Sequence, residues 1–180
     1  MTVEQAERIT AEIDARDSLA IFDRILQGPL GEKIPSVMSK TLSLRPDIFS
    51  AVMAAGKPIL FEGVLSVDLK QMIVMFIASR RNCEFCTEVH KAMLESLGIE
   101  NDLIQNCLED PDLNRVSPAY RQILEFALHA ATHPTETDDA RFTTLRDCGL
   151  NEAEILEITM LASFANFLVT WTNVSAELNG

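Results

Sequence analysis

The stretch that organises this chain is residues 80–90, Arg80-Arg81-Asn82-Cys83-Glu84-Phe85-Cys86-Thr87-Glu88-Val89-His90. It holds two of the four cysteines and one of the three histidines of the 180-residue chain. On a helix, Cys83 and Cys86 are three positions apart and Cys86 and His90 are four apart, so their side chains lie near one face. No other stretch concentrates reactive groups in this way, and we interpret the remaining chain as a scaffold for it.

The segment before the motif predicts a helix that is buried on every side. Residues 67–81 are expected to be helical, and every position in 72–78 is apolar. A helix that is apolar all round is buried all round. Ser66 is a suitable N-cap for this helix, and Asn82 is a suitable N-cap for a second helix over 83–97. We therefore expect a central helix that leads directly into the cysteine helix.

The rest of the chain also predicts helices, because no window shows the clean period-two alternation of a strand. Gly56 and Pro58 are expected to kink or interrupt one of these helices. The predicted fold class is all-α: a single-domain helical bundle, with an N-terminal helical arm at 1–30 and the main helical domain at 31–180. The further helices are expected over 3–27, 35–43, 46–61, 100–109, 118–132, 136–148 and 152–177.

The composition limits the partners that the chain can have. It carries a net charge of −12, and an acidic body is repelled by nucleic acid and by anionic membrane surfaces. The N-terminal residues lack a basic region followed by an apolar stretch, so no signal peptide is expected, and the apolar run 72–78 is too short to span a bilayer. Four cysteines in this length do not suggest a disulfide-stapled secreted scaffold. We expect a cytoplasmic protein.

A faint internal repeat relates the helix at 67–81 to the last helix of the chain. Both helices open on a leucine followed by a capping residue, and both continue into an apolar run. In the register that aligns Gln71 with Glu157, Val169 and Thr172 stand where the first copy has its two cysteines.

Three features of the sequence favour the thiolate, which is the reactive form of cysteine. Cys83 and Cys86 are expected in the first turn of their helix, at its positive end. Arg80 and Arg81 precede them. His90 lies one turn beyond Cys86 and can take or share its proton.

A lowered pKa alone does not make a catalyst. A fall in the thiol pKa from about 8.5 to about 7 raises the thiolate fraction roughly fifteenfold, but the weaker nucleophile leaves a net gain of about threefold. The site must also protonate the departing oxygen. His90, with an ordinary pKa of about 6.5, is the predicted general acid.

A pair of nearby thiols predicts a redox cycle. Attack of one thiolate on a peroxide produces a sulfenic acid, and a second thiol condenses with it to form a disulfide. An external dithiol then reopens the disulfide. The residues alone therefore predict a thiol peroxidase or a disulfide reductase.

The motif C-x-x-C-x-x-x-H after a buried helix resembles the alkylhydroperoxidase-D-like and carboxymuconolactone decarboxylase-like superfamily, particularly its uncharacterised peroxidase-related members. The resemblance continues in Leu-Glu-Phe-Ala at 124–127, in Thr-His-Pro at 132–134 and in the segment 144–155. It covers roughly residues 30–175. It implies the all-helical fold of that superfamily.

The resemblance also implies a role for each site residue. Cys86 would be the thiol that attacks the peroxide, Cys83 the resolving thiol and His90 the proton-relay partner. The helix N-terminus, by contrast, favours the first cysteine as the thiolate. The superfamily further implies a homo-oligomer, a hydroperoxide substrate and an external dithiol or lipoyl-type reductant, with no bound cofactor and no metal.

Two positions depart from the superfamily pattern, and both departures remove a proton-transfer group. Family members commonly have a glutamate twelve residues before the first cysteine, where this chain has Gln71. An amide hydrogen-bonds but does not accept a proton at neutral pH. Peroxidases of the family can also have a histidine where this chain has Phe85. We therefore place Gln71 beside the site, orienting His90 or a water, and expect weakened activity or a different substrate.

Two alternatives stay open at the level of sequence. One is a carboxymuconolactone decarboxylase-like lactone enzyme that uses His90 as acid and base. The other is a non-catalytic redox sensor or a zinc-binding module, in which Cys107, His129 or His133 would supply a further metal ligand.

Overall fold

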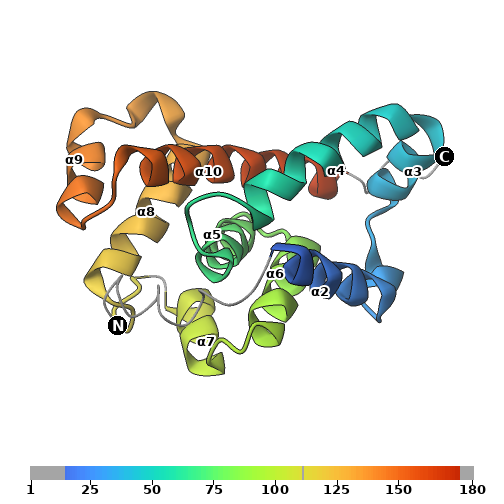
Figure 1. Cartoon of the computed structure of the whole chain (residues 1–180), viewed down its shortest axis with the longest axis horizontal. Helices are drawn as coiled ribbons and strands as arrows, with labels where there is room; N and C mark the ends of the chain where they lie inside the picture. Colours follow the sequence, from blue (N-terminus) through green and yellow to red (C-terminus); the bar gives the residue numbers. More distant parts are fainter. Residues whose placement is uncertain (1–14, 111, 175–180) are drawn as a thin grey trace.

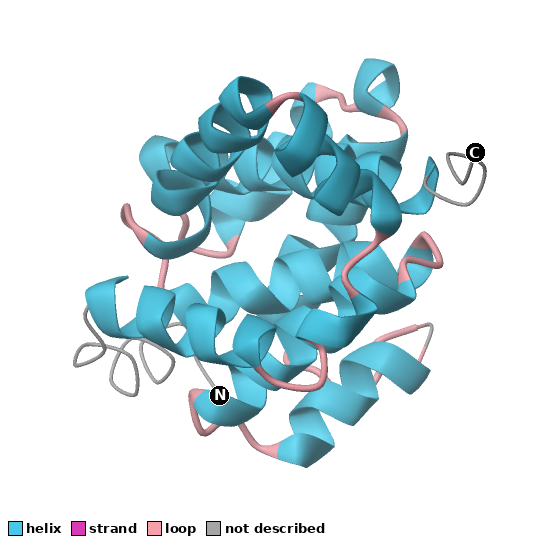
Figure 2. Cartoon of the chain, turned by 90° about the vertical axis from the view of Figure 1, so that its right-hand side faces the viewer, coloured by secondary structure: helices cyan, strands magenta, loops and turns pink. Residues whose placement is uncertain are grey.

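The structure, a computed structural model, describes residues 15–110 and 112–174, and all regular elements within these ranges are helices (Figure 2). The prediction of an all-α fold is confirmed. The predicted helix over 3–27 lies partly outside the described residues. The elements are α2 (Ala15–Gln27), the short 3-10 helix η1 (Gly31–Lys33), α3 (Ser36–Leu44), α4 (Pro46–Phe61), α5 (Val67–Arg80), α6 (Glu84–Ser96), α7 (Asn101–Glu109), α8 (Pro118–Thr132), the 3-10 helix η2 (Pro134–Glu136), α9 (Asp139–Asp147) and α10 (Glu152–Asn173).

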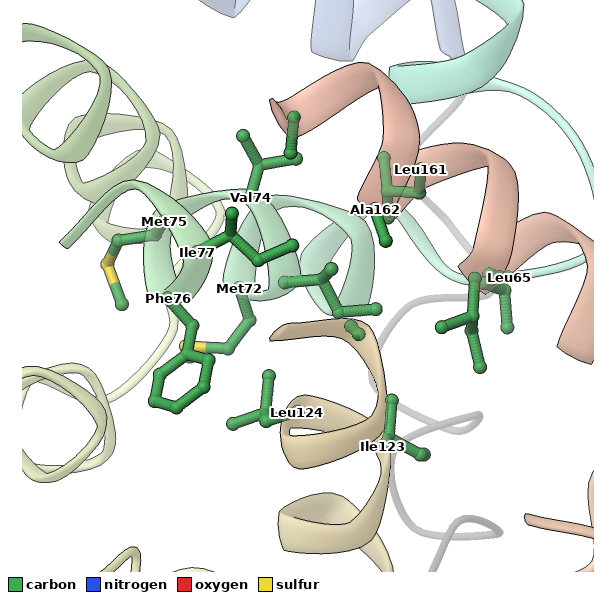
Figure 3. Close-up of a cluster of buried hydrophobic side chains, with 14 of the residues drawn as sticks. Leu65, Met72, Val74, Met75, Phe76, Ile77, Ile123, Leu124, Leu161 and Ala162 are labelled. Carbon is green, nitrogen blue, oxygen red and sulfur yellow. The ribbon is translucent and has the colours of Figure 1, made fainter. Parts of the chain in front are cut away.

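Helix α5 is the central element of the bundle (Figure 1). Its side chains from Met72 to Ala78 are each at most 2% exposed, so the prediction of a helix buried on all sides is confirmed. It packs against α6, α10 and α8. Figure 3 shows Leu124 of α8 and Leu161 of α10 lying beside it. A short turn leads from its end into α6, the helix that carries the cysteines.

The turn between α5 and α6 is tighter than expected, and the prediction that Asn82 caps the cysteine helix is wrong. Asn82 has a positive φ of 55° and belongs to the end of α5. The N–H of Cys83 donates to the carbonyl of Ala78 at 2.9 Å, and the N–H of Asn82 donates to the carbonyl of Ser79 at 3.2 Å. These two bonds make a Schellman motif, in which asparagine tolerates the left-handed backbone. Cys83 is therefore the N-cap residue of α6.

Helix α4 runs without interruption through Gly56 and Pro58, so the expected break is not found. A proline removes one backbone donor, and the buried Leu60 and Phe61 after it anchor the last turn in the core. Gly56 has a packing role instead. A Cβ atom at this position would lie 3.2 Å from Cζ of Phe164, so the glycine allows α4 to approach α10 closely.

Helix α10 begins at Glu152, the predicted start, and crosses the bundle (Figure 1). Asn151 and Glu154 form a capping box, in which each side chain bonds the other residue's backbone N–H. By length and composition α10 is the one described helix that could also cross a membrane. Its residues Ile158, Leu161 and Ala162 are buried against the core, and core helices pass the same test.

Helix α2 packs against α6 and α4, and the rings of Phe22 and Phe61 meet edge to face at 5.6 Å. These contacts place α2 beside the cysteine helix. The division of the chain at residue 30 stays a prediction.

Candidate functional site

The structure places Cys83, Cys86 and His90 at the start and on the inner face of α6. Cys83 is the N-cap residue, and Cys86 lies in the first turn. All three side chains are buried, with 1%, 5% and 3% of their surface exposed. Cys83 and Cys86 form a small buried cluster with Ala78 and Val169. The three residues of the motif therefore lie in the interior of the fold.

A cavity of about 210 Å³ reaches Cys86 and His90. Its charged lining residues, Asp23 and Lys57, are exposed, so the cavity connects the buried motif with the surface. Of the two cysteines, Cys86 lines it and Cys83 does not. The other lining residues come from α2, α3, α4, α6 and α10 and from Ile34 before α3, and they are mostly apolar, among them Phe49, Val52, Leu60, Phe85, Phe164 and Trp171.

Gln71 fixes the tautomer of His90. The side-chain Nε2 of Gln71 donates to the carbonyl of Leu60 at 3.1 Å, so the amide must turn its Oε1 towards His90. The Nδ1 of His90 lies 2.6 Å from that oxygen. Because an amide oxygen only accepts, Nδ1 carries the hydrogen and donates it. Nε2 of His90 is then left with its lone pair free.

Burial keeps His90 neutral at neutral pH. It lowers the pKa of the imidazole from its ordinary 6.5 to about 4. Gln71 has no negative charge to oppose this shift. The predicted role of His90 as a resting general acid therefore changes: the ring starts as a base, and it becomes an acid only after it has taken a proton.

The two thiols meet at a third residue, which sequence reasoning did not assign to the site. Oγ1 of Thr172, on α10, lies 3.0 Å from Sγ of Cys83 and 3.2 Å from Sγ of Cys86. The same hydroxyl lies 2.9 Å from the carbonyl oxygen of Leu168. The faint internal repeat was the available signal, since its register sets Thr172 opposite a cysteine.

The charges of the two thiols are coupled. The pKa of Cys83 is lowered to about 6, first by a hydrogen bond from the Cys86 side chain and then by one from Thr172, against the effect of burial. The pKa of Cys86 is raised, because its proton is held by Cys83 and because burial disfavours a second charge. The pair therefore holds a single proton near neutral pH, with the thiolate on Cys83.

The two arginines before the motif do not act on the thiols as the sequence suggested. The guanidinium of Arg80 donates to the carbonyls of Cys107, Leu108 and Asp110 and lies over the ring of Phe76. Arg81 donates to the side chain of Asn166. Both charges are used to join α5 to neighbouring segments. Nearness in sequence did not give the direction of these side chains.

A buried lysine ties the elements around Gln71 together. Lys70 has no exposed surface and donates to the carbonyls of Ile59 and Glu62 at the end of α4. It also pairs with the carboxylate of Glu157 on α10. Lys70 and its neighbour Gln71 thus satisfy carbonyls that the last turn of α4 leaves without helical partners.

In residues 15–110 and 112–174, no three His, Cys, Asp or Glu side chains are grouped to hold a metal ion. The side chains proposed as further zinc ligands lie on other helices. Cys107 is buried in α7, and His129 and His133 stack on each other at the end of α8.

No family model and no curated protein matches this chain, but solved structures do. An uncharacterized peroxidase-related protein from Silicibacter sp. TM1040 superposes with a TM-score of 0.71 at 22% identity, over 79% of this chain and 75% of that one. An uncharacterized peroxidase-related protein from Ralstonia eutropha JMP134, described as an alkylhydroperoxidase AhpD core, gives 0.68 at 24% identity, over 81% and 82%. A protein of unknown function from Agrobacterium tumefaciens, suggested to be the antioxidant defence protein AhpD, gives 0.64 at 23% identity, over 77% and 94%. These likenesses establish a shared fold.

Proposed function

On this alkylhydroperoxidase-D-like fold, we propose that the chain is a thiol-dependent peroxidase-like oxidoreductase that reduces hydroperoxides through a Cys83/Cys86 dithiol–disulfide cycle. One observation carries the proposal: a cavity that opens to the surface reaches both Cys86 and the neutral His90, and Thr172 holds the sulfurs of Cys83 and Cys86 close together. A peroxidase needs a thiolate, a route for the oxidant and a group that moves a proton. The related folds, named as peroxidase-related or AhpD proteins, add to this support.

Cys86 attacks the peroxide, because it is the one of the two cysteines that lines the cavity. The sulfur of Cys86 attacks one peroxide oxygen while Nε2 of His90 takes the thiol proton, so no second free thiolate forms beside that of Cys83. A sulfur–oxygen bond forms as the oxygen–oxygen bond breaks. The departing alkoxide takes the proton from His90 and leaves as an alcohol. Cys86 is left as a sulfenic acid, oxidised by two electrons.

Cys83 resolves the sulfenic acid. Its thiolate attacks Sγ of Cys86, the sulfur–sulfur bond forms, and the oxygen leaves as hydroxide, which solvent protonates to water. An external dithiol or lipoyl-type reductant then supplies two electrons and two protons to reopen the disulfide. The cycle needs no bound cofactor and no metal.

Gln71 positions His90 in this cycle. Its amide oxygen holds Nδ1–H of His90, and this leaves Nε2 as the nitrogen that exchanges protons. A glutamate at this position would also stabilise the imidazolium that forms during attack. The amide lacks that charge, so we expect a slower attack step than a glutamate would give.

The apolar cavity favours organic hydroperoxides over hydrogen peroxide. Aromatic and aliphatic side chains such as Phe49, Leu60 and Trp171 line it, and burying an apolar substrate body against them contributes binding energy. Hydrogen peroxide has no apolar body and gains nothing from this lining. We propose that selectivity for the organic substrate arises here.

Self-association and cellular location remain proposals. Exposed apolar side chains lie on α3, α4 and α10, and such a surface suits contact with a second copy of the chain. They include Leu42, Leu44, Ile48, Met160 and Phe167. We expect a cytoplasmic homo-oligomer that binds neither nucleic acid nor membranes.

Serine variants of the two cysteines test the proposed function. With cumene hydroperoxide and a dithiol reductant, Cys86→Ser should lose turnover and form no sulfenic acid. Cys83→Ser should also lose turnover, but it should accumulate a sulfenic acid on Cys86 that a dimedone probe traps. Cys148→Ser, which changes a half-buried thiol on α9's C-cap, is the matched control and should keep full activity. Turnover that survives in both site variants would refute the dithiol cycle.

One observation also suits the lactone enzyme. A neutral His90 with a free Nε2 beside an apolar cavity is a competent acid and base for that chemistry. Full activity of Cys86→Ser on a lactone substrate would select this second function.

A further inference from the structure

We propose that Thr172 is a catalytic residue of the dithiol: its hydroxyl donates a hydrogen bond to the Cys83 thiolate and keeps that sulfur ionised while the disulfide closes. This role rests on the proposed peroxidase cycle. Thr172 lies on α10, more than eighty residues after the C-x-x-C-x-x-x-H motif. The proposal therefore gives α10 a part in the chemistry that the motif itself does not contain.

The position of the hydroxyl carries the inference. Thr172 Oγ1 is within 3.0 Å of Cys83 Sγ and within 3.2 Å of Cys86 Sγ, so one oxygen serves both sulfurs. Cys83 is 1% exposed and is not among the residues that line the cavity, so water has little room to replace the hydroxyl at its sulfur.

The hydroxyl of Thr172 has one hydrogen, and two kinds of acceptor surround it: the backbone carbonyls of Leu168 and Val169, at 2.9 Å and 3.2 Å, and the two sulfurs. In the neutral dithiol, the hydrogen goes to the carbonyl of Leu168, 2.9 Å away, and the oxygen accepts from a thiol. Once a thiolate forms, donation to the charged sulfur is the stronger bond. Rotation about one side-chain bond moves the hydroxyl between the two states without moving the helix.

The hydroxyl matters most after Cys86 has been oxidised. In the reduced pair, the side chain of Cys86 is the main group that lowers the pKa of Cys83, and Thr172 is the second side chain that does so. When Cys86 becomes a sulfenic acid, its thiol proton is gone. Of these two side chains, Thr172 alone then keeps its original hydrogen-bond donor, the hydroxyl, beside the sulfur of Cys83.

The closing step balances without any further reagent from Thr172. The Cys83 thiolate gives an electron pair to Sγ of Cys86, the sulfur–sulfur bond forms, and the sulfur–oxygen bond breaks to release hydroxide. The hydroxyl hydrogen stays on Thr172 throughout. When the charge on Cys83 disappears into the disulfide, the hydroxyl is free to return to the carbonyl of Leu168.

The first test removes the Cys86 thiol and measures Cys83 alone. In Cys86→Ala and in Cys86→Ala/Thr172→Val, the ultraviolet absorbance of the thiolate is followed against pH. Both proteins also carry Cys107→Ala and Cys148→Ser, so the one thiol left of the four is Cys83 and the transition belongs to it. Loss of a hydrogen bond to a charged group should move its midpoint up by about one unit, a roughly tenfold fall in thiolate below the midpoint.

Matched variants separate the hydroxyl from the fold. Thr172→Ser keeps the hydroxyl and should restore the midpoint, and Thr172→Ala is a second removal should valine not fold. Thr159→Val is the control. Thr159 lies on the same helix, and its hydroxyl makes the same bond to a carbonyl four residues earlier, at 2.9 Å, without approaching a sulfur. A midpoint that moves equally in Thr159→Val, or not at all in Thr172→Val, overturns the proposal.

The second test follows one turnover with cumene hydroperoxide. In Thr172→Val, disulfide closure should be about threefold slower than in the wild type, because a roughly tenfold fall in thiolate is partly offset by the greater nucleophilicity of the more basic sulfur. Trapped sulfenic acid on Cys86 should accumulate. Unchanged closure overturns the role of Thr172 even where the peroxidase cycle holds. If the Cys83 midpoint shifts in Thr172→Val but the wild type forms no disulfide with peroxide, the peroxidase cycle is refuted. The catalytic role of Thr172 then fails with it, although the hydrogen bond to Cys83 is retained.

Discussion

Replacement of Gln71 by glutamate puts a carboxylate beside Nδ1 of His90, the ring nitrogen that donates to the Gln71 amide in the wild type. The two side-chain atoms lie 2.6 Å apart in a buried contact. An opposite charge at this range raises the pKa of a histidine by about one to three units. From its value of about 4, His90 should therefore titrate near 5 to 7 in Gln71→Glu. This change places the imidazolium within reach of neutral pH.

The same substitution has a structural cost. The amide Nε2 of Gln71 donates to the carbonyl of Leu60, and an ionised glutamate cannot donate. Leaving that buried carbonyl unpaired should destabilise the fold by about 1–3 kcal/mol. Gln71→Glu should therefore be oxidised faster in the first step of the cycle. The same variant should have a lower free energy of unfolding than the wild type.

The assay combines three measurements on the wild type, Gln71→Glu and a control. The titration of His90 is followed by nuclear magnetic resonance, the first oxidation by stopped-flow mixing with cumene hydroperoxide, and stability by urea unfolding. Gln105→Glu on α7, outside the cavity, is the control and should change none of them. An unchanged oxidation rate together with a His90 pKa that has not risen would refute the role given to Gln71.

Three further predictions follow from the same contacts. Because burial depresses the pKa of His90 to about 4 while the unfolded chain titrates near 6.5, its stabilising contribution is complete above pH 6.5 and is lost as pH falls towards 4. The wild type should therefore lose about 3 kcal/mol of unfolding free energy over that window relative to His90→Gln, measured by urea unfolding at each pH; equal losses would contradict a buried neutral ring. Val52→Phe should narrow the cavity and lower kcat/KM for cumene hydroperoxide about tenfold with little change for hydrogen peroxide, whereas Val64→Phe, on an exposed residue outside the cavity, should change neither; parallel losses on both peroxides would show that the cavity does not select. Lys70→Met should destabilise the protein by about 3–5 kcal/mol, because it leaves Glu157 and the carbonyls of α4 unpaired, and a loss below 1 kcal/mol in urea unfolding would contradict the buried pair.

Local signals in the sequence were enough to predict the centre of the fold. The unbroken apolar run of α5 required burial on all sides, and the spacing of Cys83, Cys86 and His90 required a shared helical face. Ser66 is the N-cap residue of α5, and α10 begins at Glu152, as the sequence indicated. Each of these features depends on residues within a few positions of one another.

What the sequence did not reveal depends on tertiary contacts or on competing local motifs. Thr172 meets the sulfurs across 86 and 89 positions of chain, and only packing of α10 against α5 and α6 brings it there. Asn82 suits both a helix start and a left-handed helix end, and the tight α5–α6 turn selects the second. Arg80 lies next to the motif in sequence but turns towards α7.

The most direct test of the dithiol cycle is a count of free thiols under anaerobic conditions, before and after one equivalent of cumene hydroperoxide. The wild-type chain should fall from four free thiols to two, and peptide mass mapping should place the new disulfide between Cys83 and Cys86. Four thiols remaining after peroxide is added, or a disulfide that joins Cys107 or Cys148, would contradict it.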